Sequence, residues 1–559
     1  MPKLPSALIE GPVGELVPLA DRLEADIVSD LAAFEIQDAS TMRSMLTTRL
    51  QIAMLKGEWS QVPGLASEVR RLQDKPAGRL TAGALSEIVA QVAEKGGDVA
   101  AKRASAESLT TQRFGAMPWS DVQDALKSLK GQLELANSDL IVGGVRAQMD
   151  PAAQNAGMKL PSTALAGLIG ARVSRDLVMP VAPAIVAGLA PIIERNTAAK
   201  PDRWSERLVA LSPRERATPV RIGIWDSGVD MALFRAAGAQ GMAFDDAGNR
   251  VPNLLRDLGE AKGRWPELKG MTKGALDLRA ALDTPESRAL KARVANLKAE
   301  DAKAFQEDLS LAGLYTHGTH VAGIAVAGNP FASVYPVAMH WAHGITPPLP
   351  TDERAQRAAQ NYQTIVTGFK EAGVRVVNMS WRYGPTFYEG ALAFHGVGKD
   401  PAERKAIAMK LFTVERDALK AAFESAPQIL FVAGSGNEDN SADFVEYIPA
   451  GFELPNLITA GAVDASGEET SFSTFGKTVV VHANGFEVDS FAPGGDRLRL
   501  SGTSMAAPQV TNLAAKLFAL NPDLTASQAK ALIVGSADRN GRVNLINPRA
   551  ALARMKSGA

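Results

Sequence analysis

The stretch VRIGIW, residues 220–225, is the first of several short runs rich in β-branched residues. Similar runs follow at residues 374–381 (VRVVNMSW), 429–436 (ILFVAGSG) and 456–463 (NLITAGAV), and alanine-rich helical stretches separate them. Continuous apolar strands that alternate with helices indicate a parallel sheet covered by helices on both faces. We therefore expect an α/β fold for this part of the chain, with its chemistry at the carboxyl ends of the strands.

The chain before residue 200 lacks these runs and favours helices. Between residues 51 and 73, apolar residues recur at helical spacing on both sides of a Gly57-Glu58-Trp59 turn, which predicts a helical hairpin. The hairpin weakly resembles one tetratricopeptide unit, but the further units that a stack of repeats needs are not found. We expect a mainly α-helical N-terminal domain over residues 1–200, interpreted either as a plain packed domain or as a recognition or inhibitory module.

A domain boundary is expected near residue 200. Residues 195–219 are polar and contain several chain breakers, which predicts a linker or surface arm. The second domain would then span residues 201–559. Just before the boundary, the apolar run 177–193 contains prolines that remove helix hydrogen bonds. We interpret this run as a buried, turn-rich segment and expect no membrane span.

Composition excludes several classes of function. The 559 residues include 60 basic and 61 acidic side chains, so the net charge of -1 gives no overall attraction to nucleic acid. The chain has no cysteine, which removes disulfides, thiolate nucleophiles and cysteine-ligated metals. Absence of cysteine slightly favours an extracytoplasmic protein over a cytoplasmic one. The N-terminus lacks the apolar region of a signal peptide, so an exported chain would have lost that signal.

Three segments contain residue types that catalysis uses. Residues 220–230 (VRIGIWDSGVD) place Asp226 after a strand, residues 315–324 (YTHGTHVAGI) contain His317 and His320, and residues 500–510 (LSGTSMAAPQV) place Ser504 at a helix start. Singly, each has a plain structural interpretation: a turn-forming acid, a core histidine and a helix cap. Their coincidence in one chain, each among glycines and small residues, favours a joint catalytic role.

The three segments resemble the signature blocks of the subtilisin-like serine peptidases, the subtilases. The resemblance implies that Ser504 is the nucleophile, His317 the general base and acid, and Asp226 the orienting carboxylate. This assignment suits the chemistry, because a serine hydroxyl is a poor nucleophile until an imidazole held in one tautomer accepts its proton. We expect His320, which lies further along the helix, to have a structural role.

A fourth block supplies a group for the negative oxygen of the intermediate. Residues 429–438 (ILFVAGSGNE) resemble the family's oxyanion block and place Asn437 after a strand. The resemblance implies that the Asn437 amide and the backbone N–H of Ser504 stabilise that oxygen.

The same resemblance implies a substrate cleft. Residues of two strands would contact the substrate: Ser380, Trp381 and Arg382 beside the residues upstream of the cleaved bond, and Ala433, Gly434 and Ser435 in the wall of a primary pocket with room for a sizeable side chain. Glu438 would lie at the rim of that pocket and could favour a basic residue. The family usually has Leu-Gly-Gly where this chain has Trp381-Arg382-Tyr383, so an open hydrophobic subsite upstream is not expected.

Two segments depart from the compact members of the family. The chain between Asp226 and His317 is far longer than they need, which predicts an insertion over about residues 234–312, and a second expansion lies at about residues 384–425. Insertions beside a cleft usually cap it or dock a neighbouring domain. The loop at residues 327–336, where the family usually binds calcium, has no carboxylate. We therefore expect no metal and no cofactor, and we interpret residues 244–249 as a plain turn.

The sequence thus predicts a serine endopeptidase that hydrolyses peptide bonds through an ester on Ser504. Its partners would be protein or peptide substrates, with possible intramolecular inhibition by the N-terminal domain. We expect no nucleic-acid partner and no membrane span. Two alternatives remain open: transfer of the acyl group to an amine, which is peptide ligation, and an inactive scaffold that only binds peptides. Covalent labelling by a fluorophosphonate would exclude the scaffold, and mass spectrometry of products would separate ligation from hydrolysis.

Overall fold

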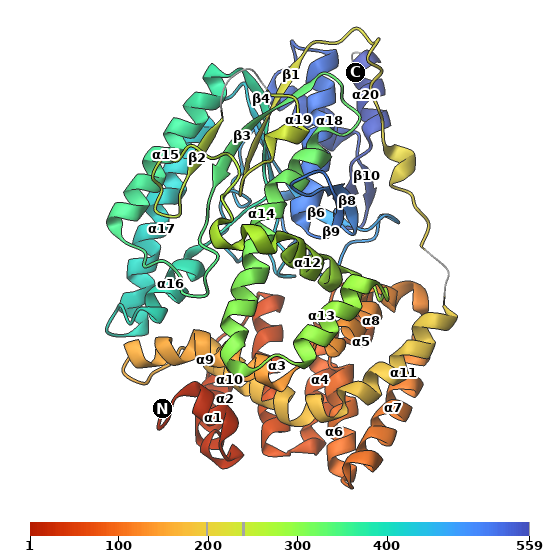
Figure 1. Ribbon diagram of the computed structural model, residues 1–559, viewed down its shortest axis with the longest axis vertical. Coiled ribbons are helices and arrows are strands. Elements are labelled where there is room, and N and C mark those ends of the chain that lie inside the picture. The colour runs from red at the N-terminus through yellow and green to blue at the C-terminus, as the bar shows by residue number, and fades with distance from the viewer. Residues whose placement is uncertain (197–199, 237–240, 558–559) are drawn as a thin grey trace.

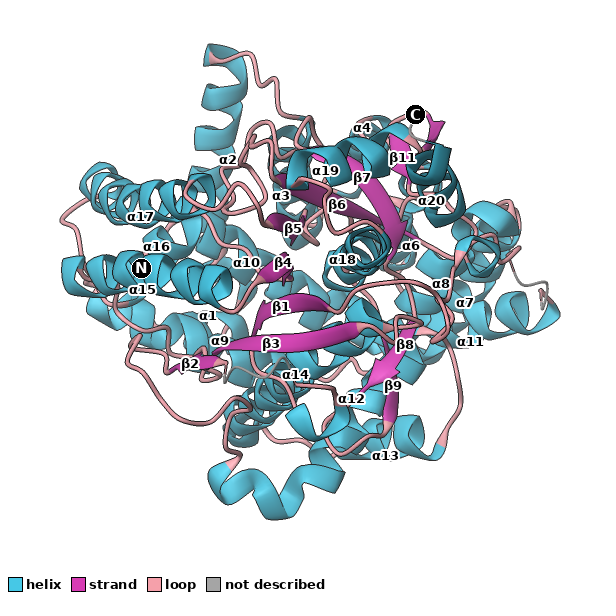
Figure 2. Ribbon diagram, turned by 90° about the horizontal axis from the view of Figure 1, so that it is seen from above, coloured by secondary structure: helices cyan, strands magenta, loops and turns pink. Residues whose placement is uncertain are grey.

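The computed structural model describes residues 1–196, 200–236 and 241–557. Within these residues, a mainly parallel sheet lies at the centre of the chain from residue 220 onward (Figures 1 and 2). In spatial order its strands are β10 (Asp538–Asn540), β11 (Val543–Leu545), β7 (Val479–Asn484), β6 (Leu457–Val463), β5 (Leu430–Gly434), β4 (Val374–Met379), β1 (Val220–Asp226), β3 (Ala332–Met339) and β2 (Met242–Phe244). All neighbouring pairs are parallel except β10 with β11. The expected α/β fold is confirmed.

Helices cover both faces of the sheet, which is why its strands are apolar on both sides. One face packs against α14 (Ala302–Val326), α18 (Thr503–Leu520), α19 (Ala526–Gly535) and α20 (Pro548–Ser557). The other face packs against α15 (Asp352–Glu371), α16 (Pro385–Phe394) and α17 (Pro401–Glu424). Burying apolar side chains in two layers of this kind supplies most of the stabilisation of an α/β domain.

The part of the chain before residue 196 is helical, as the sequence predicts. Its helices are α1 (Pro5–Glu10), α2 (Val17–Ala33), α3 (Ala39–Lys56), α4 (Val62–Arg71), α5 (Pro76–Thr81), α6 (Ala84–Lys95), α7 (Val99–Gly115), α8 (Trp119–Glu134), α9 (Ser138–Asn155), α10 (Ser162–Val173) and α11 (Ala182–Arg195). They lie below the sheet in Figure 1 and enclose two apolar cores of their own. At residues 51–73, α3 and α4 are joined by a turn in which Gly57 has a φ of 74°, a conformation that favours glycine.

The turn-rich interpretation of residues 177–193 is wrong. These residues belong to a helical stretch that runs from α10 through a π turn and a 3₁₀ turn into α11. Pro180 falls in the 3₁₀ turn and Pro183 at the start of α11, where a missing N–H costs little. By length and composition alone, the stretch Ser162–Arg195 could cross a membrane, but here Ile185 and Leu189 are buried in the N-terminal core.

Residues 200–219 lie against the sheet domain. Trp204 and Leu211 are buried in the core between the sheet and α18. The backbone of Trp204 donates to the carbonyl of Ala465, and that of Leu211 donates to the carbonyl of Gly328. The sequence expectation of a surface arm missed these contacts, because two apolar side chains suffice to hold a segment that is otherwise polar.

Residues 237–240 of the first expected insertion lie outside the described residues, and the described part includes β2, α12 (Trp265–Arg279), α13 (Pro285–Ala295) and the first turns of α14. Two glycines let the N-terminal helices approach them closely. A side chain on Gly131 of α8 would collide with the backbone of Leu278, and one on Gly143 of α9 would collide with Ala299 and Ala302. Figure 1 shows α14 running from these N-terminal helices up to the sheet.

Candidate active site

Asp226 and His317 meet at the carboxyl end of β1. Asp226 is the last residue of that strand and is fully buried, and its Oδ1 lies 2.7 Å from Nδ1 of His317 on α14. The backbone N–H of Ser227 also donates to Asp226 Oδ1, at 2.7 Å. Burial lowers the pKa of the His317 imidazole, but the Asp226 carboxylate raises it by more, so the pKa lies above its usual value. The carboxylate therefore favours a protonated Nδ1 and leaves Nε2 as the atom that can accept a proton.

Ser504 lies in the first turn of α18, whose backbone N–H groups point toward the helix start. Its hydroxyl donates to the carbonyl of Ser380 at 3.3 Å, and the Ser380 hydroxyl donates back to the carbonyl of Ser504 at 2.8 Å. Among the described residues, no hydrogen bond joins Ser504 to His317, although α14 and α18 pack side by side. Such bonds are often long or misaligned in free enzymes and form when substrate binds.

His320 is fully buried three residues beyond His317. Its Nε2 lies 2.9 Å from the carbonyl of Leu498 on β9 (Arg497–Leu500), and burial lowers its pKa to about 4. The imidazole is therefore neutral at ordinary pH and donates one hydrogen bond within the core.

Asn437 follows β5 and is oriented by Thr503, which the sequence reading did not single out. Its Oδ1 accepts the Thr503 backbone N–H at 2.9 Å and the Thr503 hydroxyl at 3.1 Å. The Thr503 hydroxyl in turn accepts the N–H of Gly436 at 3.1 Å. A Cβ on Gly502 would lie 3.4 Å from Asn437 Nδ2 and 3.6 Å from the Ser504 backbone nitrogen, so the NH₂ group lies beside the start of α18.

Arg382 and Glu438 pair with each other. Arg382 Nε donates to Glu438 Oε2 at 3.1 Å, and a second guanidinium nitrogen contacts Oε1. The guanidinium also lies 5.5 Å from the centre of the Tyr447 ring. Arg382 Nε would be 2.8 Å from a side chain on Gly436, so the arginine side chain lies against the Asn437 loop, which we define as residues 435–441.

The remaining residues expected to contact substrate are mostly turned inward. Trp381 is half-buried and its ring lies 5.3 Å from that of Trp225 and 6.0 Å from that of Tyr383. Ala433, Gly434 and Ser435 are buried. Ser435 donates to the carbonyl of Thr474 at 2.9 Å, and Gly434 packs against Thr503.

A cluster of tyrosines around Glu415 supports the Ser380–Tyr383 segment from beneath. The hydroxyls of Tyr362 and Tyr383 donate to Glu415 Oε2 at 2.7 and 2.6 Å, and that of Tyr388 donates to Oε1 at 2.6 Å. Burial raises the pKa of Glu415, and the three phenols only partly oppose this. The sequence contains a signal for this cluster that our reading missed, because Glu415 lies between Leu411 and Leu419 on the apolar side of α17.

Residues 244–249 form a turn. The Asp245 carboxylate accepts the backbone N–H groups of Ala247 and Asn249, at 3.0 and 2.7 Å. Within the described ranges, no group of three histidine, aspartate or glutamate side chains is arranged to hold a metal ion.

Comparison with known proteins agrees with the motifs. Residues 218–550 match the profile of the Subtilase family. The chain is 32% identical to subtilisin of Bacillus pumilus over 247 residues, which cover 42% of this chain and 77% of that protein. It is 29% identical to subtilisin DY of Bacillus licheniformis over 228 residues, 40% of this chain and 71% of the other. A subtilisin-like protease of Coccidioides posadasii is 37% identical over 141 residues, but the match spans only 33% of its length.

Two solved structures match this chain at low identity. The patellamide maturation protease PatG is 17% identical, with 65% of this chain and all of that chain covered, and a TM-score of 0.39. A cold-adapted subtilisin-like serine proteinase is 18% identical, with 62% and 94% covered and a TM-score of 0.35. Because the family profile covers more than half of the sequence, the chain belongs to the subtilase family and is a subtilisin-like serine endopeptidase.

Proposed function

We propose that the enzyme cleaves peptide bonds through an acyl-enzyme on Ser504, with His317 as general base and Asp226 as its orienting carboxylate. The 2.7 Å contact between Asp226 and His317 carries this proposal, because it fixes the imidazole in the tautomer that a serine protease needs. The family motifs at all three positions and the place of Ser504 at a helix start support it.

The reaction takes two acyl-transfer steps. The Ser504 hydroxyl rotates from the Ser380 carbonyl toward His317 Nε2, gives up its proton and attacks the substrate carbonyl carbon. The C–N bond then breaks, and the His317 imidazolium protonates the leaving amine. Water enters, gives a proton to His317 and attacks the ester, and the carboxylate product leaves as Ser504 regains its proton.

The negative oxygen of each intermediate needs fixed donors. In this proposal the Asn437 NH₂ group and the Ser504 backbone N–H supply them. The hydrogen bonds from Thr503 to Asn437 Oδ1 support this role, because they hold the amide before substrate arrives and so reduce reorganisation.

We also propose that the primary pocket accepts a small side chain. If the pocket lies between the segment Ser380–Arg382 and the segment Ala433–Gly436, then the Arg382 side chain occupies part of its space. The pairing of Arg382 with Glu438 fixes the arginine there and leaves Glu438 without a free charge for a basic residue. Substrates would be proteins or peptides with a small residue before the cleaved bond.

The deciding experiment compares Ser504→Ala with Ser536→Ala, which removes a hydroxyl at the C-terminal end of α19 that donates to the carbonyls of Leu532 and Ile533 in that helix. Casein cleavage and fluorophosphonate labelling should both disappear in Ser504→Ala and persist in Ser536→Ala. In subtilisin, another member of the family, loss of the serine costs about 2 × 10⁶ in kcat. Undiminished cleavage by Ser504→Ala would refute the proposal, and products extended by an added amine would indicate ligation.

A further inference from the structure

Two cations of the N-terminal domain hold a carboxylate in the Asn437 loop. Asp439 lies two residues after Asn437 and has a φ of 52°, a strained conformation for a residue other than glycine. Lys75, which precedes α5, forms an ion pair with Asp439 Oδ1 at 2.6 Å. Arg43 of α3 pairs with Asp439 Oδ2 at 3.2 Å and also donates to the Asp439 carbonyl. The neighbouring domain therefore stabilises a strained residue next to the proposed oxyanion amide.

Lys75 also joins this loop to a second segment. Its side chain is 5% exposed, and its ammonium donates to the carbonyls of Ser471 and Ser473 at 3.0 and 2.9 Å. The segment 471–474 is itself bonded to the Asn437 loop, since the N–H of Asp439 donates to the Phe472 carbonyl and that of Thr474 donates to the Gly436 carbonyl, both at 3.0 Å. One buried ammonium thus holds both sides of the backbone that carries Asn437.

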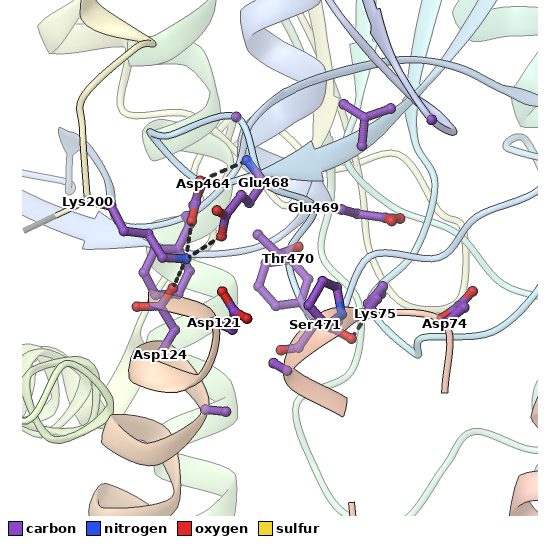
Figure 3. Close-up of a pocket in the computed structure, with 18 of the residues that line it drawn as sticks. Asp74, Lys75, Asp121, Asp124, Lys200, Asp464, Glu468, Glu469, Thr470 and Ser471 are labelled. Atoms are coloured by element: carbon purple, nitrogen blue, oxygen red, sulfur yellow. Dashed lines mark hydrogen bonds and ion pairs between the residues drawn. The ribbon is translucent and has the colours of Figure 1, made fainter. Parts of the chain in front are cut away.

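The surrounding interface is extensive and charged. Next to Lys75, a cavity of about 530 Å³ is lined by α8, by Lys200 and by residues 464–472. Figure 3 shows Lys200 directed at Asp124, Asp464 and Glu468, which it contacts at 3.0, 2.7 and 2.9 Å. On the other side of Lys75, Arg542 pairs with Asp74 and with Glu469.

Removal of the N-terminal domain would carry a large cost. Separation would leave Asp439 without either cation and would expose the close helix crossings at Gly131 and Gly143. Separation would also remove the charge compensation that holds Asp439 in its strained backbone conformation.

We propose that the N-terminal helical domain is a permanent part of the active enzyme, and that Lys75 and Arg43 are positioning residues that act on the Asn437 amide through Asp439. The inference rests on the proposed role of Asn437. It predicts that loss of Lys75 lowers kcat and leaves KM nearly unchanged, because the oxyanion exists only in the transition state.

A double-mutant cycle tests this coupling. Asn437→Ala should lower kcat about 10²- to 10³-fold, as loss of one oxyanion donor does. Lys75→Met should lower kcat roughly tenfold or more in the wild-type background and have almost no further effect in Asn437→Ala, because the residue it positions is already absent. An equal fold-change in both backgrounds would mean that Lys75 acts only on general structure, and would overturn the inference.

Controls separate positioning from folding and from the proposed function. Lys291→Met removes another cross-domain ion pair, Lys291 with Glu134 at 3.5 Å, and should keep wild-type kcat. If Lys75→Met does not fold, then Asp439→Asn replaces it in the cycle, since it removes the charge and keeps the shape. Should Asn437→Ala retain full kcat, the proposed oxyanion role fails and the inference fails with it, whereas the Ser504→Ala result stands on its own.

The size of the active species gives an independent test. Samples of the purified full chain taken during turnover and then labelled with a fluorophosphonate should give a labelled band of full length, with its N-terminal sequence intact. A species that begins near residue 200, has undiminished kcat before labelling and then labels fully would show that the helical domain is dispensable, and would overturn the inference.

Discussion

The residues on the two sides of Ser504 are held in different ways. We call Asp226 and His317 the imidazole side, and the Asn437 loop with Arg382 the amide side. On the imidazole side, a buried strand end and one long helix bring Asp226 to His317, and within the described residues no charged side chain of the N-terminal domain forms an ion pair with either. On the amide side, the Asn437 loop is held by Thr503, by Arg43 and by Lys75, and the adjoining Arg382 and Glu438 neutralise one another. The Asp226–His317 pair is therefore held by a strand end of the sheet and the helix beside it, whereas the Asn437 loop depends on contacts made by other parts of the chain.

The difference shows where this enzyme is free to differ from its family. The imidazole side needs one geometry for any substrate, and its residues fall in short contiguous motifs. The amide side adjoins the region where substrate side chains would bind, and its contacts join residues far apart in sequence. Substitutions on one side therefore test whether the kinetics that depend on the other side change.

Asp226→Asn should have the largest effect, confined to the imidazole side. An amide at this position no longer holds the imidazole in the required tautomer, and kcat should fall by about 10⁴, the loss measured for the same change in another serine protease. The pH dependence should move as well. Burial lowers the pKa of His317 and Asp226 raises it to above its usual value, so in the wild-type enzyme activity is lost as the pH falls through that raised pKa. Without the carboxylate, only the lowering effect of burial remains.

The measurement is the pH profile of kcat/KM for both enzymes. Its acid limb should shift to lower pH in Asp226→Asn. Asp245→Asn, which alters a carboxylate that only closes a turn after β2, should leave both kcat and the acid limb in place. An acid limb that does not move in Asp226→Asn would show that the titrating group is not His317.

The residues of the imidazole side could be predicted from the sequence because each lies in a short contiguous motif. The strand VRIGIW is buried on both faces and therefore reads as a continuous apolar run. The residues that follow it, like those around His317 and Ser504, form short motifs in which the glycines and small residues are part of the pattern. In these motifs the residues that define the sequence pattern are the same ones that form the local structure.

The contacts of the amide side could be predicted only in part, because they join residues that are far apart in the sequence. Nothing near Arg382 indicates that it will meet Glu438, and nothing near Lys75 indicates that it will be buried against Ser471. The prolines of residues 177–193 misled the reading for a related reason. Pro180 falls in a 3₁₀ turn and Pro183 at a helix start, where a missing N–H costs little, and Pro191 is accommodated inside α11.

Arg382→Ala should alter the amide side alone. Removal of the side chain opens the space against Gly436, so substrates with a large apolar residue before the cleaved bond should improve by roughly tenfold in kcat/KM, the scale of a few methylene groups in a hydrophobic pocket. Substrates with a small residue there should change little. A peptide library with one varied position measures this profile.

Glu438→Gln is the matched control, because it removes the charge that pairs with Arg382 but leaves the arginine in place. It should keep the preference for small residues and add tolerance for acidic ones. A library profile that is unchanged in Arg382→Ala would mean that the primary pocket lies elsewhere.

Tyr383→Phe and Tyr388→Phe should have the smallest effects, and together they test whether the support beneath the cleft matters for binding. Each removes one phenol from Glu415. Tyr388→Phe leaves Oε1 without its donor in the buried cluster and should cost about 1–3 kcal/mol of unfolding free energy, while Tyr383→Phe leaves Tyr362 on Oε2 and should cost about 0.5–1.5 kcal/mol.

The effects of the two substitutions on KM should have the opposite order, with the larger effect in Tyr383→Phe. Tyr383 directly follows the proposed substrate segment and exchanges backbone hydrogen bonds with Ile448, so freeing its ring should raise KM by roughly threefold with kcat unchanged. Tyr388 lies on α16 and is not part of that segment, so its loss should leave KM as it was. Denaturant unfolding gives the first ranking and peptide kinetics the second. If the variant that loses more unfolding free energy also had the larger rise in KM, then the Glu415 cluster would act only on the fold. The geometry of the amide side would then depend on Thr503, Arg43 and Lys75.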